Sequence, residues 1–356
     1  MVPSSEILLY GAAGVTGRMI LNRLASRGLK PRLAGRDTER LAALGAQYAL
    51  RIYEAKIDDP AALANCLPQG GLLINAAGPF AITAKPLIDA ALSCGCDYFD
   101  VSGELDSLRA LLALDGAAKD AGRVLIGGGG FGIAATDILV SKLAAALGDL
   151  DSLRISVAAD SAFSSGGVAE STLAVLAGGG AEIISGEITR VRLARKRWRE
   201  QTPEGGSIHF ASAPLADLIG ASWIAHAQEI VAGVPMPPMQ ARATSLIAPL
   251  FPLFLKFPPM RRALARMGGH SGSAARKHVS RAWVRGNKKG FSRTLMIEGG
   301  EGFALAADIA AHAVAHYLQA RPAAGAHTPA SAFGPSWLDG LPGIRFYSEA
   351  SEDIHA

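Results

Sequence analysis

Residues 7–18, which read Ile-Leu-Leu-Tyr-Gly-Ala-Ala-Gly-Val-Thr-Gly-Arg, decide the fold of this chain. The apolar run Ile7–Tyr10 predicts a strand, a glycine-rich turn follows it, and apolar residues then recur at the spacing of a helix. The N-terminus of a helix exposes unpaired N–H groups and the positive end of the peptide dipole, so it binds phosphate. A strand, a glycine-rich turn and a helix in this order predict a dinucleotide site.

The glycines of this turn read G-x-x-G-x-x-G, and Ala12 stands where the usual G-x-G-x-x-G pattern has its second glycine. The pattern alone is a weak signal, because the chain holds 41 glycines and a tight turn without a ligand would also show it. The alternating strands and helices that follow favour dinucleotide binding. The candidate cofactor-binding residues of the turn are Gly11, Ala13, Gly14, Val15, Thr16 and Gly17.

The composition indicates a globular protein of a reducing compartment. With 356 residues, 49% of them hydrophobic and 19% charged, the chain is long enough for two domains and is not disordered. Its three cysteines are too few for a disulfide framework, and Cys94-Gly-Cys96 has no second ligand pair for a zinc site. We expect no metal site. The first residues lack a charged signal-peptide segment, so we expect a cytoplasmic protein.

The net charge of +4 is concentrated in two basic stretches, 190–199 and 256–293. Nucleic acid is not an expected partner, because aromatic residues make up only 6% of the chain and no nucleic-acid-binding module is present. The apolar run 246–255 precedes the second basic stretch, and it is too short and too broken by proline to span a bilayer. Peripheral membrane contact through 246–266 and burial as a connecting segment are both open hypotheses.

An α/β fold is expected, with a Rossmann domain over residues 1–135. Short apolar runs alternate there with helical patterns, which predicts a doubly wound parallel sheet with helices on both faces. The expected helices are 17–28, 38–47, 60–66, 83–94 and 106–121. The expected strands are Ile7–Tyr10, Pro31–Ala34, Arg51–Tyr53, Leu72–Asn75, Tyr98–Val101 and Val124–Ile126.

A second α+β domain with a mixed or antiparallel sheet is expected over residues 136–300. Its strands come without regular crossover helices, and Asn287-Lys288-Lys289-Gly290 is a good hairpin turn. A helix over about 301–321 is expected to pack back on the first domain, and 322–356 to form a C-terminal tail. The expected strands are Leu153–Ala159, Ile188–Leu193, Gly206–Phe210, Trp223–Ala227, Val279–Arg285 and Phe291–Glu298.

The end of the second strand indicates which dinucleotide binds. In NAD-binding proteins an acidic residue at this place holds the ribose 2′-hydroxyl, whereas an arginine receives a 2′-phosphate. Arg36 occupies the position, and Asp37 is expected to cap the following helix. We therefore predict NADP(H) as the cofactor, with an exposed arginine at the start of a helix as the alternative.

Ligands of open α/β sheets bind at the carboxyl ends of the strands, and three more segments bring candidates there. Small residues after the fourth strand would let the backbone run beside the nicotinamide ribose. Asp58, after the third strand, is a candidate contact on the adenine side, and helix capping is an equal alternative for it and for Glu104. The further candidates are the cofactor contacts Asn75, Ala76, Ala77, Gly78 and Pro79 and the proton donors Asp100, Ser102 and Glu104.

The chain resembles the saccharopine dehydrogenase-like oxidoreductases, a family that includes the trans-acting enoyl reductases. The resemblance lies in five segments of the first 140 residues and returns weakly at 301–303 and 328–334. It implies a Rossmann domain, a second domain with a mixed sheet, and dependence on a pyridine nucleotide. The five segments are Gly11–Gly17, Ala34–Arg36, Asn75–Phe80, Tyr98–Glu104 and Gly130–Asp137.

The last of these segments departs from the family pattern. Gly132 and Ala135 stand where members often carry an acidic residue and a proline, which puts a catalytic acid in this loop in question. Asp137 remains a candidate proton donor, and capping of a helix that runs to Leu147 is the alternative.

Taken together, the loops and the resemblance predict NADP(H)-dependent hydride transfer to a C=C or C=O bond of an apolar, lipid-like substrate. Crevice loops rich in glycine and alanine, together with the apolar run 246–255, argue against an amino dicarboxylic acid as the substrate. The alternatives are a catalytically silent NADP-binding sensor or membrane-associated scaffold, and a reductase of amino-acid imines. A homodimer is a further hypothesis.

Two other enzyme classes are excluded. None of the six tyrosines is followed by lysine four residues later, as a short-chain dehydrogenase requires, and the Gly-x-Ser-x-Gly elbow of α/β-hydrolases is absent. His312 and His316 share a helix face, but position 313 is alanine rather than the glutamate of the zinc-binding H-E-x-x-H motif. We expect a packed or exposed pair of helical histidines there.

Overall fold

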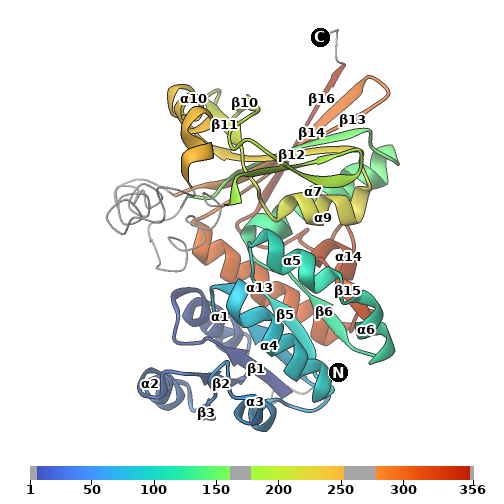
Figure 1. The fold of residues 1–356 in the computed structure, drawn as a ribbon. Coiled ribbons are helices and arrows are strands. Elements are labelled where there is room, and N and C mark those ends of the chain that lie inside the picture. Colours follow the sequence, from blue (N-terminus) through green and yellow to red (C-terminus); the bar gives the residue numbers. More distant parts are fainter. Residues whose placement is uncertain (1–5, 161–177, 252–277, 353–356) are drawn as a thin grey trace. The chain divides into compact units, whose positions relative to one another are not determined.

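The computed structural model describes residues 6–160, 178–251 and 278–352 (Figure 1). The chain divides into two compact units, each with its own sheet. The first unit contains the chain up to residue 134 together with residues 303–341. The second contains residues 135–302 and the segment from residue 342 onward.

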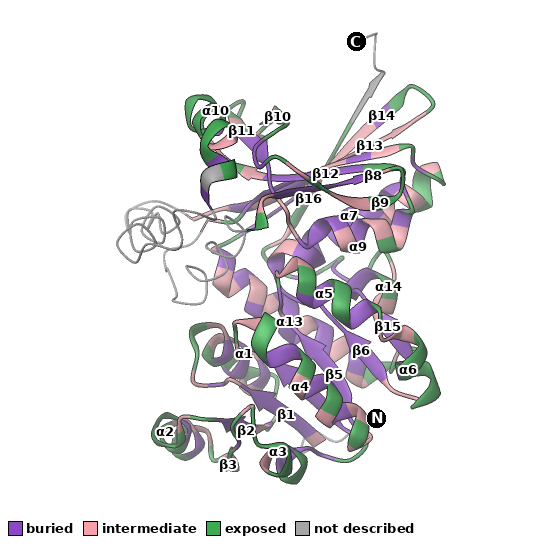
Figure 2. Ribbon diagram, in the orientation of Figure 1, coloured by how far each residue is buried: buried purple, intermediate pink, exposed green. Residues whose placement is uncertain are grey.

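The sheet of the first unit is parallel throughout and doubly wound, which confirms the predicted α/β class. Its central strands are buried along their whole length (Figure 2), as expected of apolar runs covered by helices on both faces. In spatial order the strands are β15 (Gly325–His327), β6 (Val124–Ile126), β5 (Asp97–Asp100), β4 (Leu72–Asn75), β1 (Ile7–Tyr10), β2 (Arg32–Gly35) and β3 (Ile52–Glu54).

The helices of the first unit follow the predicted rhythm. The expected helix 106–121 divides into two, and its apolar pattern runs across the break because Leu108, Leu111 and Ala118 are all buried. The helices are α1 (Val15–Ser26), α2 (Thr38–Tyr48), α3 (Pro60–Cys66), α4 (Phe80–Ser93), α5 (Leu105–Leu112), α6 (Asp115–Asp120), α13 (Gly302–Gln319) and α14 (Pro329–Phe333).

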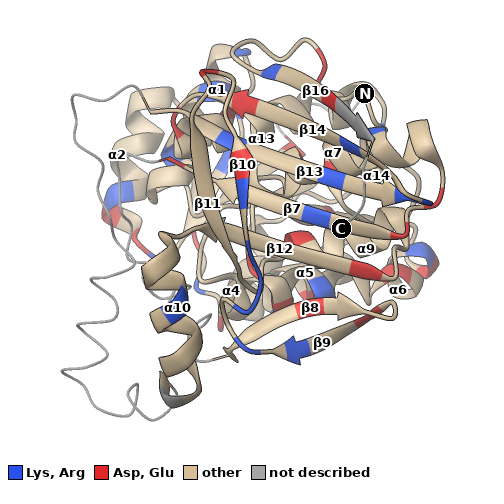
Figure 3. Ribbon diagram, turned by 90° about the horizontal axis from the view of Figure 1, so that it is seen from above, with Lys and Arg blue, Asp and Glu red and all other residues tan. Residues whose placement is uncertain are grey.

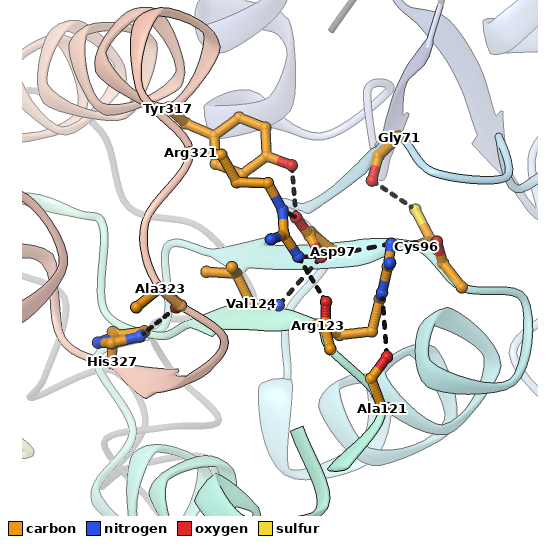
Figure 4. A network of polar contacts seen from close by, with 12 residues as sticks. Gly71, Cys96, Asp97, Ala121, Arg123, Val124, Tyr317, Arg321, Ala323 and His327 are labelled. Atoms are coloured by element: carbon orange, nitrogen blue, oxygen red, sulfur yellow. Dashed lines mark hydrogen bonds and ion pairs between the residues drawn. The ribbon is translucent and has the colours of Figure 1, made fainter. Parts of the chain in front are cut away.

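A buried carboxylate fastens α13 to the N-terminal end of β5 (Figure 4). Asp97 is fully buried and accepts hydrogen bonds from the Tyr317 hydroxyl at 2.6 Å and from Nε of Arg321 at 2.5 Å. The backbone N–H of Val124, at the start of the neighbouring strand, donates to the same carboxylate at 3.0 Å. Burial, together with the hydrogen bond to Asp97, raises the pKa of Tyr317. This network explains why a helix so late in the chain belongs to the first unit.

The sheet of the second unit is mixed, as predicted: β12 runs parallel to β7, and the other paired strands are antiparallel. The main path contains β10 (Arg197–Gln201), β11 (Ser207–Ser212), β12 (Glu229–Pro235), β7 (Ser152–Ala158), β13 (Ser280–Lys288), β14 (Phe291–Gly299) and β16 (Arg345–Glu352), with β8 (Gly180–Ile184) beside β12 and β9 (Glu187–Val191) beside β8. The helices are α7 (Phe131–Leu147), α9 (Asp217–Ala225) and α10 (Pro238–Ile247).

The strand predicted at Trp223–Ala227 is wrong. Trp223–Ala225 form the end of α9, whose buried side chains include Leu218, Ala221 and Ala225 at intervals of three and four residues. A short apolar run fits a buried strand and a buried helix equally well, so the helical period becomes visible only over the longer segment. The chain turns at His226, which has φ 49°, and the strand of this region follows as β12.

The hairpin predicted at 287–290 is confirmed. β13 ends at Lys288, which pairs with Phe291, and the two loop residues Lys289 and Gly290 both have positive φ, 48° and 86°. Two positive φ values identify the type I′ turn, whose twist matches that of the flanking strands.

The tail predicted at 322–356 is wrong, because both parts of it enter a sheet. β15 pairs with β6 in the first unit, and β16 pairs with β14 in the second. Both strands lie at the edge of their sheet, where each pairs with one neighbouring strand. Their sequences show little alternation of apolar and polar residues, so the pattern alone did not predict them.

Part of the basic stretch 190–199 neutralises a buried acid. Glu182 of β8 is fully buried, and its carboxylate pairs with Arg195 at 2.5 Å and with Lys196 at 3.3 Å. Figure 3 shows basic residues on β9 and β10; Arg190 lies in β9, and Arg197 and Arg199 lie in β10. A solvated basic face, with one buried acid paired beneath it, accounts for this concentration of charge.

The apolar run 246–255 is described only in part. Leu246 and Ile247 end α10 with 73% and 46% of their surface exposed, and Met239 at the start of this helix is 83% exposed. Ala248 and Phe251, which follow α10, are buried. Residues 252–266 lie outside the described residues, so membrane contact stays a prediction. Among the helices that the structure describes, none is long and apolar enough to cross a membrane.

Candidate cofactor site

Two of the predicted loops meet at the point where the strand order reverses. β1 lies between β2 and β4, so the chain connections on its two sides run in opposite directions and open a crevice at the carboxyl ends of the strands. The N–H of Ala76 donates to the carbonyl oxygen of Tyr10 at 2.9 Å. A Cβ on Gly11 would lie 2.8 Å from the Cβ of Ala77. The turn after β1 and the loop after β4 are therefore in direct contact.

The glycines of the first turn are required by close backbone approach. Gly11 has φ +87°, which disfavours any residue with a side chain. A Cβ on Gly17 would lie 2.2 Å from the carbonyl oxygen of Gly11, closer than atoms can approach. Gly17 therefore lets α1 pack against the turn, which is the part played by the last glycine of dinucleotide-binding fingerprints.

The N-terminus of α1 is open and lacks a side-chain cap. Its N-cap residue is Gly14, and the first turn carries no acidic residue. The first hydrogen bond of the helix runs from the N–H of Arg18 to the carbonyl oxygen of Gly14, at 3.0 Å. The N–H groups of Val15, Thr16 and Gly17 precede it and have no acceptor inside the helix. These donors, the helix dipole and the glycine cradle together fit a diphosphate group.

The positive charge predicted at the end of β2 is available. Arg36 is exposed. The neighbouring Asp37 is the N-cap of α2, as predicted, and accepts a hydrogen bond from the backbone N–H of Arg40 at 3.1 Å. Because Asp37 is engaged in this cap, it is poorly placed to hold a ribose 2′-hydroxyl, whereas the Arg36 guanidinium could pair with a 2′-phosphate.

The capping alternative for Asp58 is wrong, since α3 is capped by Asp59, which accepts from the N–H of Ala62 at 3.0 Å. Asp58 is exposed. Burial raises the pKa of Tyr10 most, with the charge of Asp58 adding to that rise and the charge of Arg36 opposing it. Both charges are therefore near the carboxyl end of β1, and the adenine-side contact of Asp58 stays a prediction.

Asn75 shapes the loop after β4 from within. Its side chain is fully buried, and its Oδ1 accepts a hydrogen bond from the N–H of Ala77 at 3.0 Å. Its Nδ2 lies 3.1 Å from the hydroxyl of Tyr98 and 3.3 Å from Oγ1 of Thr83. The side chain thus holds the loop, which contains the cis peptide Gly78–Pro79. The cofactor contacts of Ala76–Pro79 stay predictions.

The candidate proton donor Asp100 is engaged by protein groups. It is 2% exposed, and its Oδ1 accepts from the N–H groups of Ser102 at 2.9 Å and Gly128 at 3.0 Å. The hydroxyl of Tyr98 donates to its Oδ2 at 2.9 Å. Burial raises the pKa of Asp100, and these hydrogen bonds oppose that rise. Its geometry is that of a residue that ties together the loops after β5 and β6.

Glu104 caps a helix, but not the one that follows it. Its side chain makes no cap hydrogen bond to α5 and instead accepts from the N–H groups of Phe80 at 3.0 Å and Ala81 at 2.7 Å, at the start of α4. The oxygen of Ser102, itself buried, accepts from the N–H of Glu104 at 3.1 Å. Glu104 is therefore a helix-capping residue, as the alternative predicted, but it caps α4, which precedes it in the chain, so no local sequence pattern shows the cap.

Asp137 belongs to the chain's second unit, whereas Asp100 and Glu104 belong to the first. It sits in the second turn of α7, which begins at Phe131, so the alternative that it caps this helix is wrong. Its neighbour Thr136 donates to Oδ1 of Asp217 at 2.7 Å, and burial raises the pKa of that carboxyl group.

The histidines on α13 form the packed helical pair that the sequence predicts. Nε2 of His312 lies 2.8 Å from the carbonyl oxygen of Trp337 and 3.1 Å from Nε2 of His316. Burial lowers the pKa of His312. In the described parts of the chain, no three His, Cys, Asp or Glu side chains come together as a metal site would require.

Residues 7–126, the series from β1 to β6, match the family model of the saccharopine dehydrogenase NADP binding domain. The chain is 30% identical over 147 residues to a probable mitochondrial saccharopine dehydrogenase-like oxidoreductase of Arabidopsis thaliana, a match that covers 36% of this chain and 32% of that protein. It is 32% identical over 148 residues to a trans-acting enoyl reductase of Mycobacterium ulcerans, which covers 39% of this chain and 35% of that protein. These matches span about a third of the length of the curated relatives.

Among solved structures, the apo saccharopine dehydrogenase (L-Glu forming) of Saccharomyces cerevisiae has a TM-score of 0.67 to this chain. The alignment covers 97% of this chain and 99% of that one at 13% sequence identity. At this identity the likeness shows a shared fold.

Proposed function

We propose that this chain, whose residues 7–126 match the saccharopine dehydrogenase NADP binding domain, transfers a hydride between NADP(H) and a C=C or C=O bond of an apolar substrate. The observation that carries this proposal is the open N-terminus of α1 beside the exposed Arg36, at the carboxyl edge of the sheet. When bound there, the cofactor would supply the hydride, and the N–H groups of α1 would hold its diphosphate.

The choice of NADP over NAD rests on one side chain. Arg36 supplies a guanidinium at the end of β2, and Asp37 is committed to capping α2. Arginine receives a 2′-phosphate through charge-assisted hydrogen bonds, whereas a 2′-hydroxyl calls for an acidic partner.

The proposed apolar character of the substrate rests on the loops and on α10. Ala76, Ala77 and Gly78 bring no charge to the crevice, and α10 exposes Met239 and Leu246. The names of the relatives include an enoyl reductase, whose substrate class carries a polarised C=C bond.

The decisive experiment is to measure oxidation of NADPH and NADH by the purified chain with a panel of enones, ketones and imines of graded apolarity. Turnover of long-chain enones or ketones with NADPH supports the proposal. Preference for imines of amino dicarboxylic acids would contradict the proposed substrate class but not the cofactor.

A catalytically silent NADP-binding protein is the second candidate, and one observation favours it. Asp100, Ser102 and Glu104, the acids and hydroxyl of the crevice, are all engaged in hydrogen bonds that hold loops and helices. Tight binding of NADPH without turnover across the whole panel would support this candidate against the first.

A further inference from the structure

Two buried tyrosines of the first unit each use their hydroxyl group to tie down a segment at the end of a strand. Tyr10 ends β1, and its hydroxyl donates to the carbonyl oxygen of Ala55, directly after β3, at 3.0 Å. Tyr98 lies in β5, and its hydroxyl donates to Oδ2 of Asp100, at the end of the same strand, at 2.9 Å. In the strand order of the sheet, β3 and β5 lie on opposite sides of β1. The two hydroxyl groups therefore hold segments on opposite sides of the central strand.

The Tyr98 hydroxyl links the ends of two neighbouring strands. While it donates to Asp100, it accepts a hydrogen bond from Nδ2 of Asn75, at the end of β4, at 3.1 Å. A hydroxyl has one hydrogen and two lone pairs, so a single phenol can serve both neighbours. Burial raises the pKa of Tyr98 well above its usual range, so the phenol keeps the hydrogen that it donates. Tyr98 is thus a link between two buried side chains.

Asn75 and Asp100 extend this link into three loops. Oδ1 of Asn75 accepts from the N–H of Ala77, in the loop after β4, at 3.0 Å. Oδ1 of Asp100 accepts from the N–H groups of Ser102, after β5, at 2.9 Å and of Gly128, after β6, at 3.0 Å. Both side chains are buried, where a lost hydrogen bond is not replaced by water. One phenol therefore connects the loops that follow three adjacent strands.

The sheet places the two tyrosines in different halves of a dinucleotide site. A doubly wound sheet consists of two mononucleotide-binding halves that meet where the strand order reverses. The first half here is β1 to β3, with the glycine-rich turn and Arg36, and the proposed function assigns it to the adenosine end of the cofactor. The second half is β4 to β6, which leaves it for the nicotinamide end. Tyr10 belongs to the first half and Tyr98 to the second.

We propose that Tyr98 is a positioning residue for the nicotinamide end of the cofactor and Tyr10 one for the adenosine end; this inference rests on the function proposed above. Both hydroxyl groups are buried and bonded to protein groups, so they act through the loops that they hold. Removing the Tyr98 hydroxyl takes one partner each from Asn75 and Asp100, which loosens the loops after β4, β5 and β6. The glycine-rich turn and Arg36 stay in place.

The test compares Tyr98→Phe with Tyr10→Phe in the full chain, because each variant loses one buried hydroxyl and keeps the ring. Calorimetric titration measures the affinity for NADPH and for adenosine 2′,5′-bisphosphate, which carries the 2′-phosphate but no nicotinamide. Tyr98→Phe should weaken NADPH about 10-fold, the effect of one buried hydrogen bond, and change the affinity for the bisphosphate by less than about 2-fold. Tyr10→Phe should weaken both ligands by the same factor, because both contain the adenosine end.

The outcomes separate this inference from the proposed function. Equal losses for the two ligands in Tyr98→Phe, or no loss for either, overturn the inference, and so does a loss confined to NADPH in Tyr10→Phe. In each of these cases the wild-type chain still binds NADPH, and the proposed function stands. A wild-type chain that binds neither NADPH nor the bisphosphate overturns the proposed function, and the inference with it.

A second variant keeps the test valid if Tyr98→Phe does not fold. The Thr83 hydroxyl, on α4, donates to the carbonyl oxygen of Ala77 at 2.6 Å and accepts from Nδ2 of Asn75 at 3.3 Å. Thr83→Val keeps the shape of the side chain and removes both hydrogen bonds, so it should weaken NADPH and spare the bisphosphate. Without any ligand, the N–H of Ala77 should exchange its hydrogen faster in this variant than in the wild-type chain. Unchanged exchange, or equal weakening of both ligands, contradicts the positioning role.

Discussion

The parallel sheet has an N-terminal edge and a C-terminal edge, where its strands begin and end, and charged groups are paired differently at the two. β5 has a buried aspartate at each edge. At the N-terminal edge Asp97 is neutralised within the fold by Arg321, at 2.5 Å. At the C-terminal edge, the described donors to Asp100 are neutral N–H and O–H groups, while Arg36 and the start of α1 are left to solvent. Charge that is paired inside the protein holds the fold together. Positive charge that is left open at the carboxyl edge is what an anionic cofactor can bind.

The largest effect on stability is expected from Asp97→Ala, which removes the buried acid at the N-terminal edge of the sheet. It leaves two buried donors, the Tyr317 hydroxyl and the Val124 N–H, without their acceptor, and each such loss costs about 1–3 kcal/mol of stability. Urea unfolding should show this loss. Arg40→Ala is the matched control, because its pair with Asp37 is exposed and should contribute less than about 1 kcal/mol. Equal losses in the two variants would contradict the comparison.

At the C-terminal edge, Arg36→Ala should weaken NADPH binding and leave the free energy of unfolding unchanged. Loss of a charge-assisted contact to a 2′-phosphate is expected to weaken NADPH about 10- to 100-fold. NADH, which lacks that phosphate, should be nearly unaffected. Titration of intrinsic fluorescence with each cofactor measures both affinities. Arg40→Ala serves again as the neighbouring-arginine control, and equal loss for NADPH and NADH in Arg36→Ala would contradict the assignment.

Variants of Glu104 test whether the acids at the C-terminal edge of the sheet stabilise the fold or donate a proton in the reaction. Glu104→Ala removes the acceptor of two N–H groups at the start of α4 and should cost about 0.5–2 kcal/mol, as a lost helix cap does. Glu104→Gln, which keeps one acceptor oxygen, should lose less. Stability and turnover are measured on both. If Glu104→Gln keeps its stability but loses turnover, the residue is a proton donor, as the sequence suggested.

The smallest effect is the pH dependence that Asp100 contributes. Because burial raises the pKa of this acid above its unfolded value, its contribution to stability is full below the unfolded pKa of about 4 and is lost as pH rises through the folded pKa. Wild-type stability relative to Asp100→Asn should therefore fall as pH rises above about 4. Unfolding free energies measured across the acid range test the sign, and a rising difference would contradict it.

The predictions from sequence succeeded where the signal is local. Each strand of the first six in the parallel sheet lies within one residue of its predicted bounds, because these runs are apolar and bounded by turn residues. The cap at Asp37 and the type I′ turn at Lys289–Gly290 were readable for the same reason. Where a short apolar run was ambiguous, as at Trp223–Ala227, helix and strand could not be told apart.

The candidate site divides in the same manner. The sequence by itself determined the glycine-rich turn after β1 and the position of Arg36 at the end of β2, because both depend on residues within a few positions of a strand end. Only the tertiary structure decided that Glu104 caps α4, that Asp97 fastens α13, and that Tyr98 meets Asn75 across 23 positions of the chain. These contacts join residues that are distant in sequence and leave no periodic pattern, so they exist only once the sheets have brought the strand ends together.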